Sequence, residues 1–307
     1  MSAQGITEKS DGAVSGSEQG MMKELDECQI TVVGLGLMGG SLAGALEGKC
    51  RAVVGVARRT ETIDAARRLG FIDRGTTSLS DGVGEADIVV LATPVGVILQ
   101  QIPEIAPSLR PDCLLMDLGS TKAAIVRAME EVPEGIQPLG GHPMCGKETS
   151  GLEGAEPTLY RGATFILSPL PRTSEGALEL GRGLTRAVGS VPLVLDAQRQ
   201  DFLTGTLSHL PYLMACALVA TADATTSADP AAWQIVAGGF RDTARIAASD
   251  VTMMTDILLT NQQEVSKALS VLRGQIDSLR VLVESGDPEL IHKALSEIRQ
   301  RRMEMYS

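Results

Sequence analysis

The feature that most restricts the fold is the glycine-rich turn GLGLMGG. It lies between an apolar run rich in β-branched residues, Cys28–Val33, and SLAGALEG, whose apolar residues have helical spacing. Gly34, Gly36 and Gly39 give it the spacing GxGxxG. In such a unit the first glycine permits a tight turn, the second lets the backbone approach a pyrophosphate, and the third lets helix and strand pack closely. An ordinary glycine-rich turn is the alternative, but the flanking strand and helix favour a dinucleotide site. The same site would include Leu35, Leu37 and Met38.

Strand and helix signals alternate through the first two thirds of the chain. A second apolar run, Arg51–Val56, is followed by apolar residues at helical spacing that end at Gly70, which completes a βαβ unit. Further strands are predicted at Ala86–Ala92, Cys113–Leu118, Ala163–Leu167 and Val191–Leu195, with helices around Val95–Ala106 and Thr121–Glu131. This alternation predicts an α/β fold of the Rossmann type, a doubly wound and mostly parallel sheet.

Beyond Val191–Leu195 the strand signal disappears and long helical periods follow. They run over Ala197–Ala222, Ala231–Ala248, Val251–Glu284 and Pro288–Met305. We therefore expect a tail (1–24), a dinucleotide-binding domain (25–196) and an all-α C-terminal domain (197–307). The stretch LPYLMACALVATA is too short to span a bilayer and suits a helix buried on every side, which favours a homodimer through this domain.

Composition narrows the function further. The first 24 residues are rich in Ser, Gly and Glu and lack a basic start and an apolar core, which indicates a disordered tail, no signal peptide and a cytoplasmic protein. A net charge of −11 disfavours nucleic acid and membrane partners, and an anionic substrate would need a local cluster of cations. Five scattered cysteines without CxxC spacing predict free thiols and no metal site.

The end of the second predicted strand indicates which cofactor is preferred. An NAD site usually has an acidic residue there for the ribose hydroxyl, whereas this chain has Ala57, Arg58, Arg59 and Thr60. Two guanidinium groups beside a hydroxyl suit a 2′-phosphate. The sequence therefore favours NADP over NAD, with a solvated helix start as the alternative interpretation.

Histidines are the candidate bases for a hydride transfer from an alcohol, since a neutral imidazole accepts a hydroxyl proton near neutral pH. Of the three in the chain, His292 lies among charged residues and is predicted to be a surface residue. His209 opens the apolar stretch in SHLPY, and His142 lies in GGHPMCG, which we interpret as a loop. His142 is the best candidate because of this setting.

From Gln29 to the C-terminus, the chain resembles the prephenate/arogenate dehydrogenase family. Six pieces carry the resemblance in this order: GLGLMGGSLA, ATPV, DLGSTK, GHPMCGKETSG, SHLP and GGFRDTARIA. By this resemblance, ATPV places Thr93 and Pro94 at the cofactor. Longer members carry a C-terminal ligand-sensing ACT domain, whereas the present sequence stops at its last predicted helix, so a short form is expected.

The resemblance also implies roles for individual side chains. His142 corresponds to the catalytic base and Ser120 to the serine that orients it, although Ser120 could also cap a helix before Lys122. His209 corresponds to a second active-site histidine. Arg241 corresponds to the arginine that binds a substrate carboxylate, and Glu148 to an acidic residue that gates the pocket.

The implied substrate is a cyclohexadienol with two carboxylates, and Arg241 with Arg245 one helical turn later would supply the cations that hold it. His142 would take the ring hydroxyl proton, hydride would pass to the oxidised nicotinamide, and loss of carbon dioxide would give an aromatic ring. No metal is needed for this reaction.

Two departures from the family pattern concern the choice of substrate. Gln200 precedes Asp201 where many relatives have a histidine, and Tyr212 stands where SHLPH is common, so both could border the substrate side chain. Prephenate is favoured and arogenate stays open. A β-hydroxyacid dehydrogenase is disfavoured because no lysine lies between Gln200 and Gln263. A protein that senses NADP without catalysis is the alternative from another class.

Overall fold

The computed structural model describes residues 23–147 and 149–305, and it contains one eight-stranded sheet. The strand order is β3-β2-β1-β4-β5-β6-β7-β8, and every neighbouring pair is parallel except β6 and β7. The strands are β1 (Gln29–Val33), β2 (Ala52–Val56), β3 (Arg74–Thr76), β4 (Ile88–Leu91), β5 (Leu114–Asp117), β6 (Gln137–Pro143), β7 (Thr164–Pro169) and β8 (Val191–Val194). The first six follow the Rossmann order, which confirms the predicted fold class.

Two strands differ from the sequence expectation. The short β3 was not predicted, and neither was β6, which contains His142. The interpretation of GGHPMCG as a loop around His142 is therefore wrong, because His142 pairs with Ile166 of β7 inside the sheet. Most of the expected tail, residues 1–22, lies outside the described residues.

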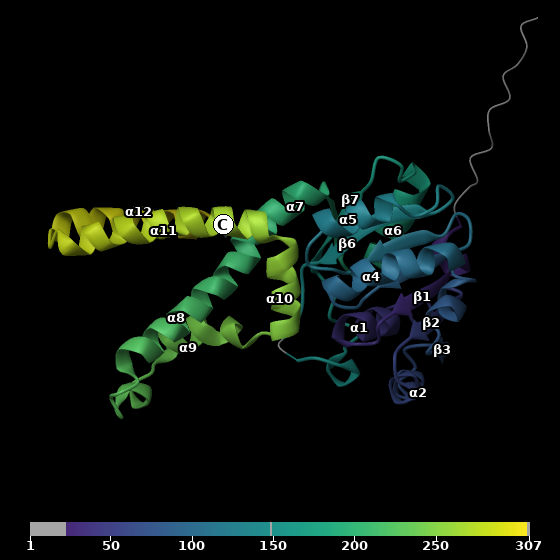
Figure 1. Cartoon of the computed structure of the whole chain (residues 1–307), viewed down its shortest axis with the longest axis horizontal. Coiled ribbons are helices and arrows are strands. Elements are labelled where there is room, and N and C mark those ends of the chain that lie inside the picture. The colour runs from purple at the N-terminus through teal and green to yellow at the C-terminus, as the bar shows by residue number, and fades with distance from the viewer. Residues whose placement is uncertain (1–22, 148, 306–307) are drawn as a thin grey trace, which may run out of the picture.

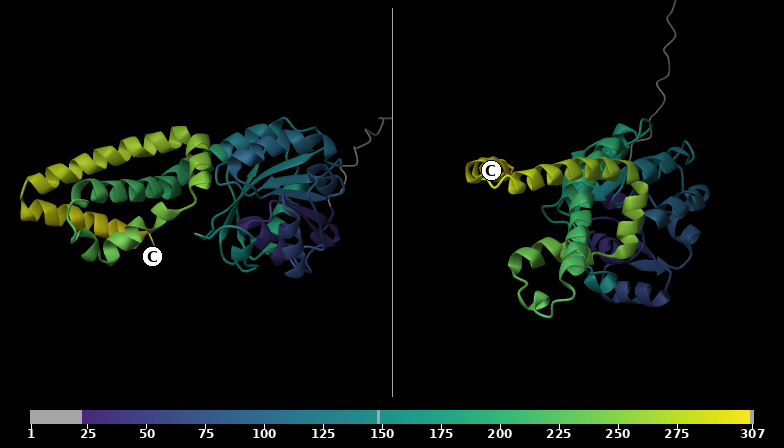
Figure 2. Two further views of the ribbon diagram at one scale, coloured as in Figure 1. Left: turned by 60° about the horizontal axis from the view of Figure 1, so that its bottom comes forward. Right: turned by 60° about the vertical axis from the view of Figure 1, so that its left-hand side comes forward.

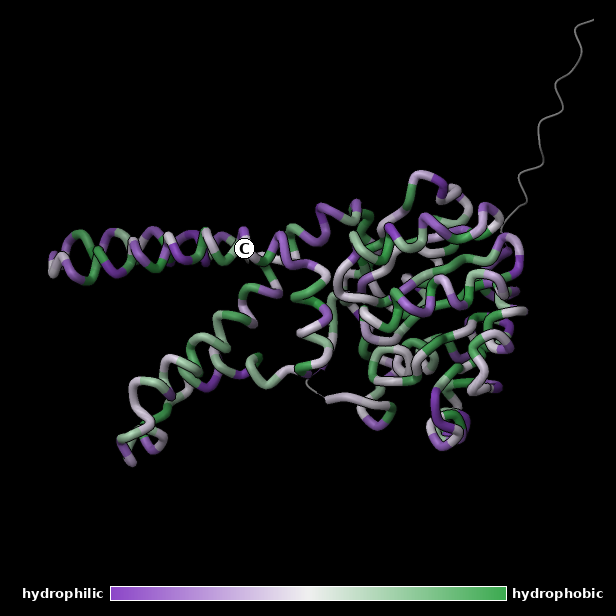
Figure 3. Tube along the Cα trace, viewed as in Figure 1, coloured by the Kyte–Doolittle hydropathy of each residue, from purple (hydrophilic) through white to green (hydrophobic). Residues whose placement is uncertain are grey.

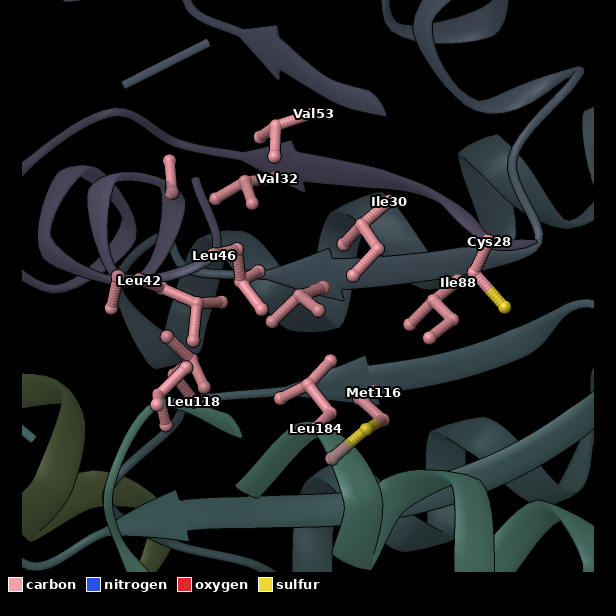
Figure 4. Packing of buried hydrophobic residues seen from close by; sticks show 14 of the residues in the cluster. Cys28, Ile30, Val32, Leu42, Leu46, Val53, Ile88, Met116, Leu118 and Leu184 are labelled. Carbon is pink, nitrogen blue, oxygen red and sulfur yellow. The ribbon is translucent and has the colours of Figure 1, made fainter. Parts of the chain in front are cut away.

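Helices cover both faces of the sheet, as a doubly wound fold requires. One face packs against α1 (Leu37–Ala45), α2 (Thr60–Arg68) and α6 (Glu175–Ala187), and the other against α3 (Leu79–Val83), α4 (Val95–Ile105) and α5 (Ala123–Glu130). Alternate residues of a strand point to opposite faces, so Ile30 and Val32 meet Leu42 on the first face while Val33 faces the second. Figure 4 shows the core of the first face between β1 and α1. We call residues 25–196 the sheet region.

Residues 197–305, which we call the helical region, contain no strand. A continuous helical run consists of α7 (Ala197–Thr204), a π-helical turn (Gly205–His209) and α8 (Leu210–Thr226). It is followed by α9 (Gly238–Ala244), α10 (Val251–Thr260), α11 (Gln262–Glu284) and α12 (Pro288–Glu304). The predicted helix Val251–Glu284 is therefore two helices, which part at Asn261. Short 3-10 turns lie at Leu25–Glu27, Ala106–Ser108, Leu152–Gly154, Ala232–Gln234 and Arg245–Ala248.

The helical region extends away from the sheet region as two diverging pairs, α8 with α9 and α11 with α12 (Figures 1 and 2). Hydrophobic residues run along α8 (Figure 3), yet only Ala215 of that helix is buried within the protomer. The expectation of a helix buried on every side is therefore not met by one chain. The whole run Ala197–Thr226 is also longer than expected, and by length and composition alone it could cross a membrane, with 22% of its most apolar window buried.

Candidate active site

The glycine-rich turn has the geometry that a dinucleotide requires. Gly34 adopts a φ of +98°, which favours glycine, and it leads from β1 towards α1. A Cβ atom on Gly39 would overlap the carbonyl oxygen of Gly34, so the helix approaches the strand more closely than a side chain permits. A Cβ atom on Gly36 would meet no heavy atom within 4 Å, and Gly36 begins α1 without a side-chain cap. The turn therefore offers an open backbone surface at a helix N-terminus, which fits a pyrophosphate.

The neighbouring predicted cofactor residues line the same edge of the sheet. Thr93 follows β4, its methyl group is 2.7 Å from a Cβ atom built on Gly34, and Pro94 begins α4. The side chain of Leu35 lies in the core, while Leu37 and Met38 are half-buried in the first turn of α1. This group therefore forms one continuous edge around the glycine turn.

The residues that favour NADP lie where β2 ends and α2 begins. Arg59 is the N-cap residue of α2, Thr60 is its first residue, and Arg58 precedes them. All three are exposed, and neither arginine forms an ion pair or side-chain hydrogen bond with any residue in the described part of the chain. Both guanidinium groups are therefore available for an anionic group.

His142 is held at the carboxyl end of β6 by a residue from the helical region. The imidazole is 8% exposed, and its Nδ1 lies 3.2 Å from Nε2 of Gln200 on α7. The same amide nitrogen donates to the backbone carbonyl of Ser120 at 3.5 Å. The hydroxyl of Ser120 forms no hydrogen bond with another described residue, so the direct partner of the imidazole is Gln200. Because Gln200 is fully buried, its side chain has no exposed surface for a substrate.

A buried ion pair lies close to His142. The Nζ atom of Lys122 contacts Oδ2 of Asp117, and both side chains are fully buried. The same oxygen of Asp117 also accepts the amide hydrogen of Gly119 (2.7 Å), and Oδ1 accepts that of Gly141 (3.0 Å). Gly141 directly precedes His142, so this carboxylate joins the end of β5 to the strand that carries the imidazole.

Two aspartates of the helical region cap helices of the sheet region. The N-cap residues of α4 and α5 are Pro94 and Lys122, and neither supplies a side-chain cap. Instead, Asp256 on α10 accepts the amide of Gly96 at 2.8 Å. Asp201 on α7 accepts the amides of Lys122 (2.7 Å) and Ala123 (2.8 Å). Asp201, and not Ser120, therefore caps the N-terminus of α5. These caps join the two regions at helix N-termini.

His209 closes the π-helical turn that separates α7 from α8. It is 1% exposed, and its Nδ1 lies 3.2 Å from Nδ2 of Asn261, the residue at which α10 and α11 part. The Asn261 amide also donates to the backbone carbonyl of Asp201 at 2.8 Å. A π turn contains one residue more than an α turn and is frequent at functional sites.

Burial keeps both histidines uncharged at neutral pH. Removal from water lowers the pKa of His142 to about 3, and the nearby Lys122 and His209 contribute to that decrease. Removal from water also lowers the pKa of His209 to about 4. Because a proton on His209 would lower the proton affinity of His142, the two histidines lie in one electrostatic environment. A neutral imidazole is the form that can accept a proton.

The remaining predicted site residues are not brought against these histidines by any described hydrogen bond or ion pair. Arg241 is exposed on α9, and Arg245 lies just beyond that helix, in the 3-10 turn Arg245–Ala248. Tyr212 is half-buried on α8, one turn after His209. Glu148 lies outside the described residues. His292 is exposed on α12, as expected for a surface residue.

Sequence reasoning did not identify several residues of this site. Asp117 and Lys122 form a D-x4-K spacing at the end of a predicted strand. A pair of opposite charges at such a place could have indicated a buried ion pair near the site. No sequence pattern pointed to Asn261, because it lies 52 residues from His209, which it contacts. The contact between Gln200 and His142 spans 58 residues and depends on how the helical region docks.

Comparisons with known proteins agree with this architecture. A family model described as the nucleotide-binding domain of prephenate dehydrogenase matches residues 42–193, and one described as its dimerization domain matches residues 196–297. The prephenate dehydrogenase of Bacillus subtilis is 35% identical over 264 residues, which is 85% of this chain and 71% of that one.

Two solved structures extend the likeness to three dimensions. The prephenate dehydrogenase of A. aeolicus, in complex with hydroxyphenyl propionate and NAD+, has a TM-score of 0.84 and 33% identity, over 92% of this chain and 100% of that one. The arogenate dehydrogenase of Synechocystis has a TM-score of 0.79 and 29% identity, over 90% and 99% of the two chains. The chain belongs to the prephenate dehydrogenase family.

Proposed function

We propose that this protein is a dehydrogenase that oxidises and decarboxylates prephenate to 4-hydroxyphenylpyruvate in tyrosine biosynthesis. The observation that carries the proposal is the buried, uncharged His142 at the carboxyl end of β6. It lies on the sheet edge that also carries the glycine turn, because β1, β4, β5 and β6 are parallel and end at the same edge. The relatives named above support the substrate class.

His142 acts as the general base that removes the proton of the ring hydroxyl group. Its pKa of about 3 keeps it unprotonated before reaction, and the buried Lys122 disfavours retention of the proton afterwards. The bound cofactor supplies the hydride acceptor. His209 stays uncharged beside His142 and serves as a second polar group of the pocket.

Arg241 and Arg245 are the proposed cations for the carboxylates of the substrate, with Glu148 and Tyr212 at the border of the pocket. Support comes from the acidity of the chain, whose net charge of −11 repels a dianion except where cations gather. Arogenate differs from prephenate by an amino group in place of a keto group, and it is the alternative substrate. The likeness to an arogenate dehydrogenase keeps it open.

NADP is the proposed cofactor in preference to NAD, because Arg58 and Arg59 are exposed beside Thr60. Replacement of both arginines by alanine would raise the KM for NADP by about tenfold or more, since each charge-assisted hydrogen bond contributes on the order of 1.5 to 3 kcal/mol. The KM for NAD would change little. The matched control is Arg67→Ala with Arg68→Ala, later on the same helix. An equal loss with both cofactors would contradict the preference.

We also propose a domain boundary between residues 196 and 197, a homodimer through the helical region and a cytoplasmic location. The strands end at Val194 and the helical run begins at Ala197. The exposed apolar residues of α8 and α11 suit burial against a second copy. The family model over residues 196–297 is described as a dimerization domain.

The experiment that tests the function is reduced-cofactor formation at 340 nm, with prephenate and arogenate each combined with NAD and NADP. We expect the highest kcat/KM with prephenate and NADP. Faster turnover of arogenate would replace the substrate, and faster turnover with NAD would replace the cofactor. Absence of turnover in all four mixtures, with the fold intact by circular dichroism, would contradict the proposed reaction.

A further inference from the structure

Gln200 makes an unusual set of contacts for a buried side chain. Its Nε2 lies 3.2 Å from Nδ1 of His142 and 3.5 Å from the carbonyl oxygen of Ser120. Its Oε1 is buried and has no hydrogen-bond partner among the described residues. An unpartnered buried acceptor costs about 1 to 3 kcal/mol, so its retention beside the candidate base calls for an explanation.

The contact determines which nitrogen of His142 carries the proton. When the amide nitrogen of Gln200 donates to Nδ1, Nδ1 must be an acceptor, and the proton of the neutral ring is on Nε2. A ring in this state cannot accept a second proton at Nε2 without first losing the one it has. To act as a base at Nε2, His142 needs its proton on Nδ1 and an acceptor facing that proton.

The unpartnered Oε1 of Gln200 can be that acceptor. A half-turn of the terminal amide about χ3 exchanges its oxygen and nitrogen without moving the rest of the side chain, and χ3 of glutamine is a broad torsion with two roughly equivalent states. The half-turn goes together with a proton exchange with solvent, in which Nε2 releases its proton and Nδ1 takes one up. Oε1 then accepts a hydrogen bond from Nδ1–H, and the lone pair of Nε2 is available. We propose that Gln200 is a positioning residue that selects the tautomer of His142 by the orientation of its amide. This inference rests on the proposed role of His142 as the base.

Within residues 23–147 and 149–305, no charged group around the imidazole can take this place. Asp117 is occupied by Lys122 and by two backbone amides. Asp201, on the same helix as Gln200, is occupied by the amides of Lys122 and Ala123. His209 packs nearby with its Nδ1 against Asn261. The uncharged amide of Gln200 is therefore the described group at Nδ1, and unlike a carboxylate it does not raise the pKa of the imidazole.

The proton transfer balances with these groups. The O–H bond of the substrate hydroxyl breaks and an Nε2–H bond forms, while Nδ1 keeps its proton and donates it to Oε1 of Gln200. The ring is then an imidazolium beside the ammonium group of Lys122, which favours release of the Nε2 proton to solvent. Gln200 gains and loses no proton in this step.

The test compares Gln200→Glu, which offers only acceptors while it is ionised, with Gln200→Leu, which offers neither donor nor acceptor. The protein has three histidines, so the 15N signals of the labelled full-length chain can be assigned with His209→Asn and His292→Gln. Ring nitrogens with and without a proton have different 15N shifts, so the spectrum reports the tautomer without any need for turnover. Gln262→Leu, on the exposed surface of α11, is the matched control.

We expect His142 of the unmodified protein to carry its proton on Nε2 and that of Gln200→Glu to carry it on Nδ1. Gln200→Glu should also move the acid limb of the kcat profile to higher pH by about one unit or more, because an adjacent carboxylate raises the pKa of the imidazole. Gln200→Leu should lower kcat by about 10- to 100-fold with little change in the KM for substrate, a loss of the size found when the partner that orients a metal-bound histidine is removed.

Two results would overturn the inference. One is an Nε2–H tautomer and an unshifted acid limb in the Gln200→Glu variant. The other is a Gln200→Leu variant with the kcat of the control. If the unmodified protein turned over neither prephenate nor arogenate, the proposed reaction would fail, and the tautomer measurement would still decide the role of Gln200.

Discussion

The sheet region and the helical region bury their apolar residues to very different extents. The two faces of the sheet are covered by helices of the same chain, and side chains such as Ile88 and Leu114 are fully buried. In the helical region, side chains such as Val271, Ile276 and Val283 are more than half exposed. The sheet region therefore has a complete hydrophobic core of its own, whereas the helical region leaves many of its apolar side chains exposed within one chain.

The candidate active site lies where these two regions meet. The sheet region contributes the glycine turn, His142 and Lys122, and the helical region contributes Gln200 and His209. Function therefore depends on a region that one chain leaves incompletely packed. Changes in the two regions should therefore differ in their effects on chemistry, assembly, acid stability and docking.

The largest effect should be a loss of turnover, with no change in assembly, when a residue of the sheet region is replaced. Replacement of His142 by asparagine removes the base but keeps a polar side chain of similar width, so kcat should fall by roughly 10² to 10⁴. Cofactor affinity and oligomeric mass should not change, as measured by cofactor titration and light scattering. A variant with normal kcat would assign the base to another residue, and His209→Asn is the first comparison to make.

The next effect should come from the helical region and should concern assembly. Met214→Glu with Val219→Glu places two charges on the exposed apolar surface of α8, and burial of an unpaired charge costs several kcal/mol. We expect the proposed dimer to dissociate to monomers at micromolar concentration, as measured by light scattering. The control is Leu69→Glu, an exposed apolar position in the sheet region. Dissociation by the control alone would reverse the comparison.

Acid should destabilise the contact between the regions. The pKa values of His142 and His209 in the folded protein, about 3 and about 4, lie below the value of 6.5 for an unfolded chain. The unfolded state therefore binds more protons below pH 6.5, and the free energy of unfolding falls as the pH drops through that value. Between pH 7 and pH 5 the loss should be about 2 kcal/mol for each histidine. Urea unfolding at the two pH values measures it, and the variant His142→Asn with His209→Asn should lose most of the difference.

The smallest effect should be the loss of stability when a helix N-cap is removed. It should differ between a cap that lies within one region and a cap that joins the two regions. Asp256→Ala uncaps α4 across the contact, and Ser174→Ala uncaps α6 locally. Each should cost about 1 kcal/mol. Fluorescence of Trp233 reports the helical region, since it is the single tryptophan, and circular dichroism reports both regions. In Asp256→Ala the fluorescence transition should precede the dichroism transition, whereas in Ser174→Ala the two should coincide. Coincident transitions in both variants would mean that the cap does not couple the regions.

Periodicity and the glycine turn were sufficient to predict the fold class and most elements. They failed at β6, because its sequence QPLGGHP contains two prolines and two glycines, which are poor strand formers. Its structure comes from pairing with β5 and β7. Gly141 also has a packing reason, since a Cβ atom there would overlap the carbonyl oxygen of Asp117. Such a strand is determined by its neighbours more than by its own residues.

The candidate site could be predicted only for residues that lie within recognisable motifs. His142 and His209 stood out because of their local sequence, but their partners Gln200 and Asn261 lie 58 and 52 residues away. The caps of α4 and α5 come from still farther along the chain. Asp256 lies 160 residues from the α4 amide that it caps, and Asp201 lies 78 and 79 residues from the two α5 amides. Contacts of this kind depend on how two regions dock, which no local pattern records.

The two interregion caps also make the contact between the regions observable in solution. Among the described residues, the amides of Gly96, Lys122 and Ala123 are hydrogen-bonded only to aspartates of the helical region, so they lose protection from hydrogen exchange whenever the regions separate. Amides inside β4 and β5 stay paired within the sheet during that motion. The ratio of the two exchange rates therefore measures the free energy of separation of the two regions in the intact protein, without a label or a ligand.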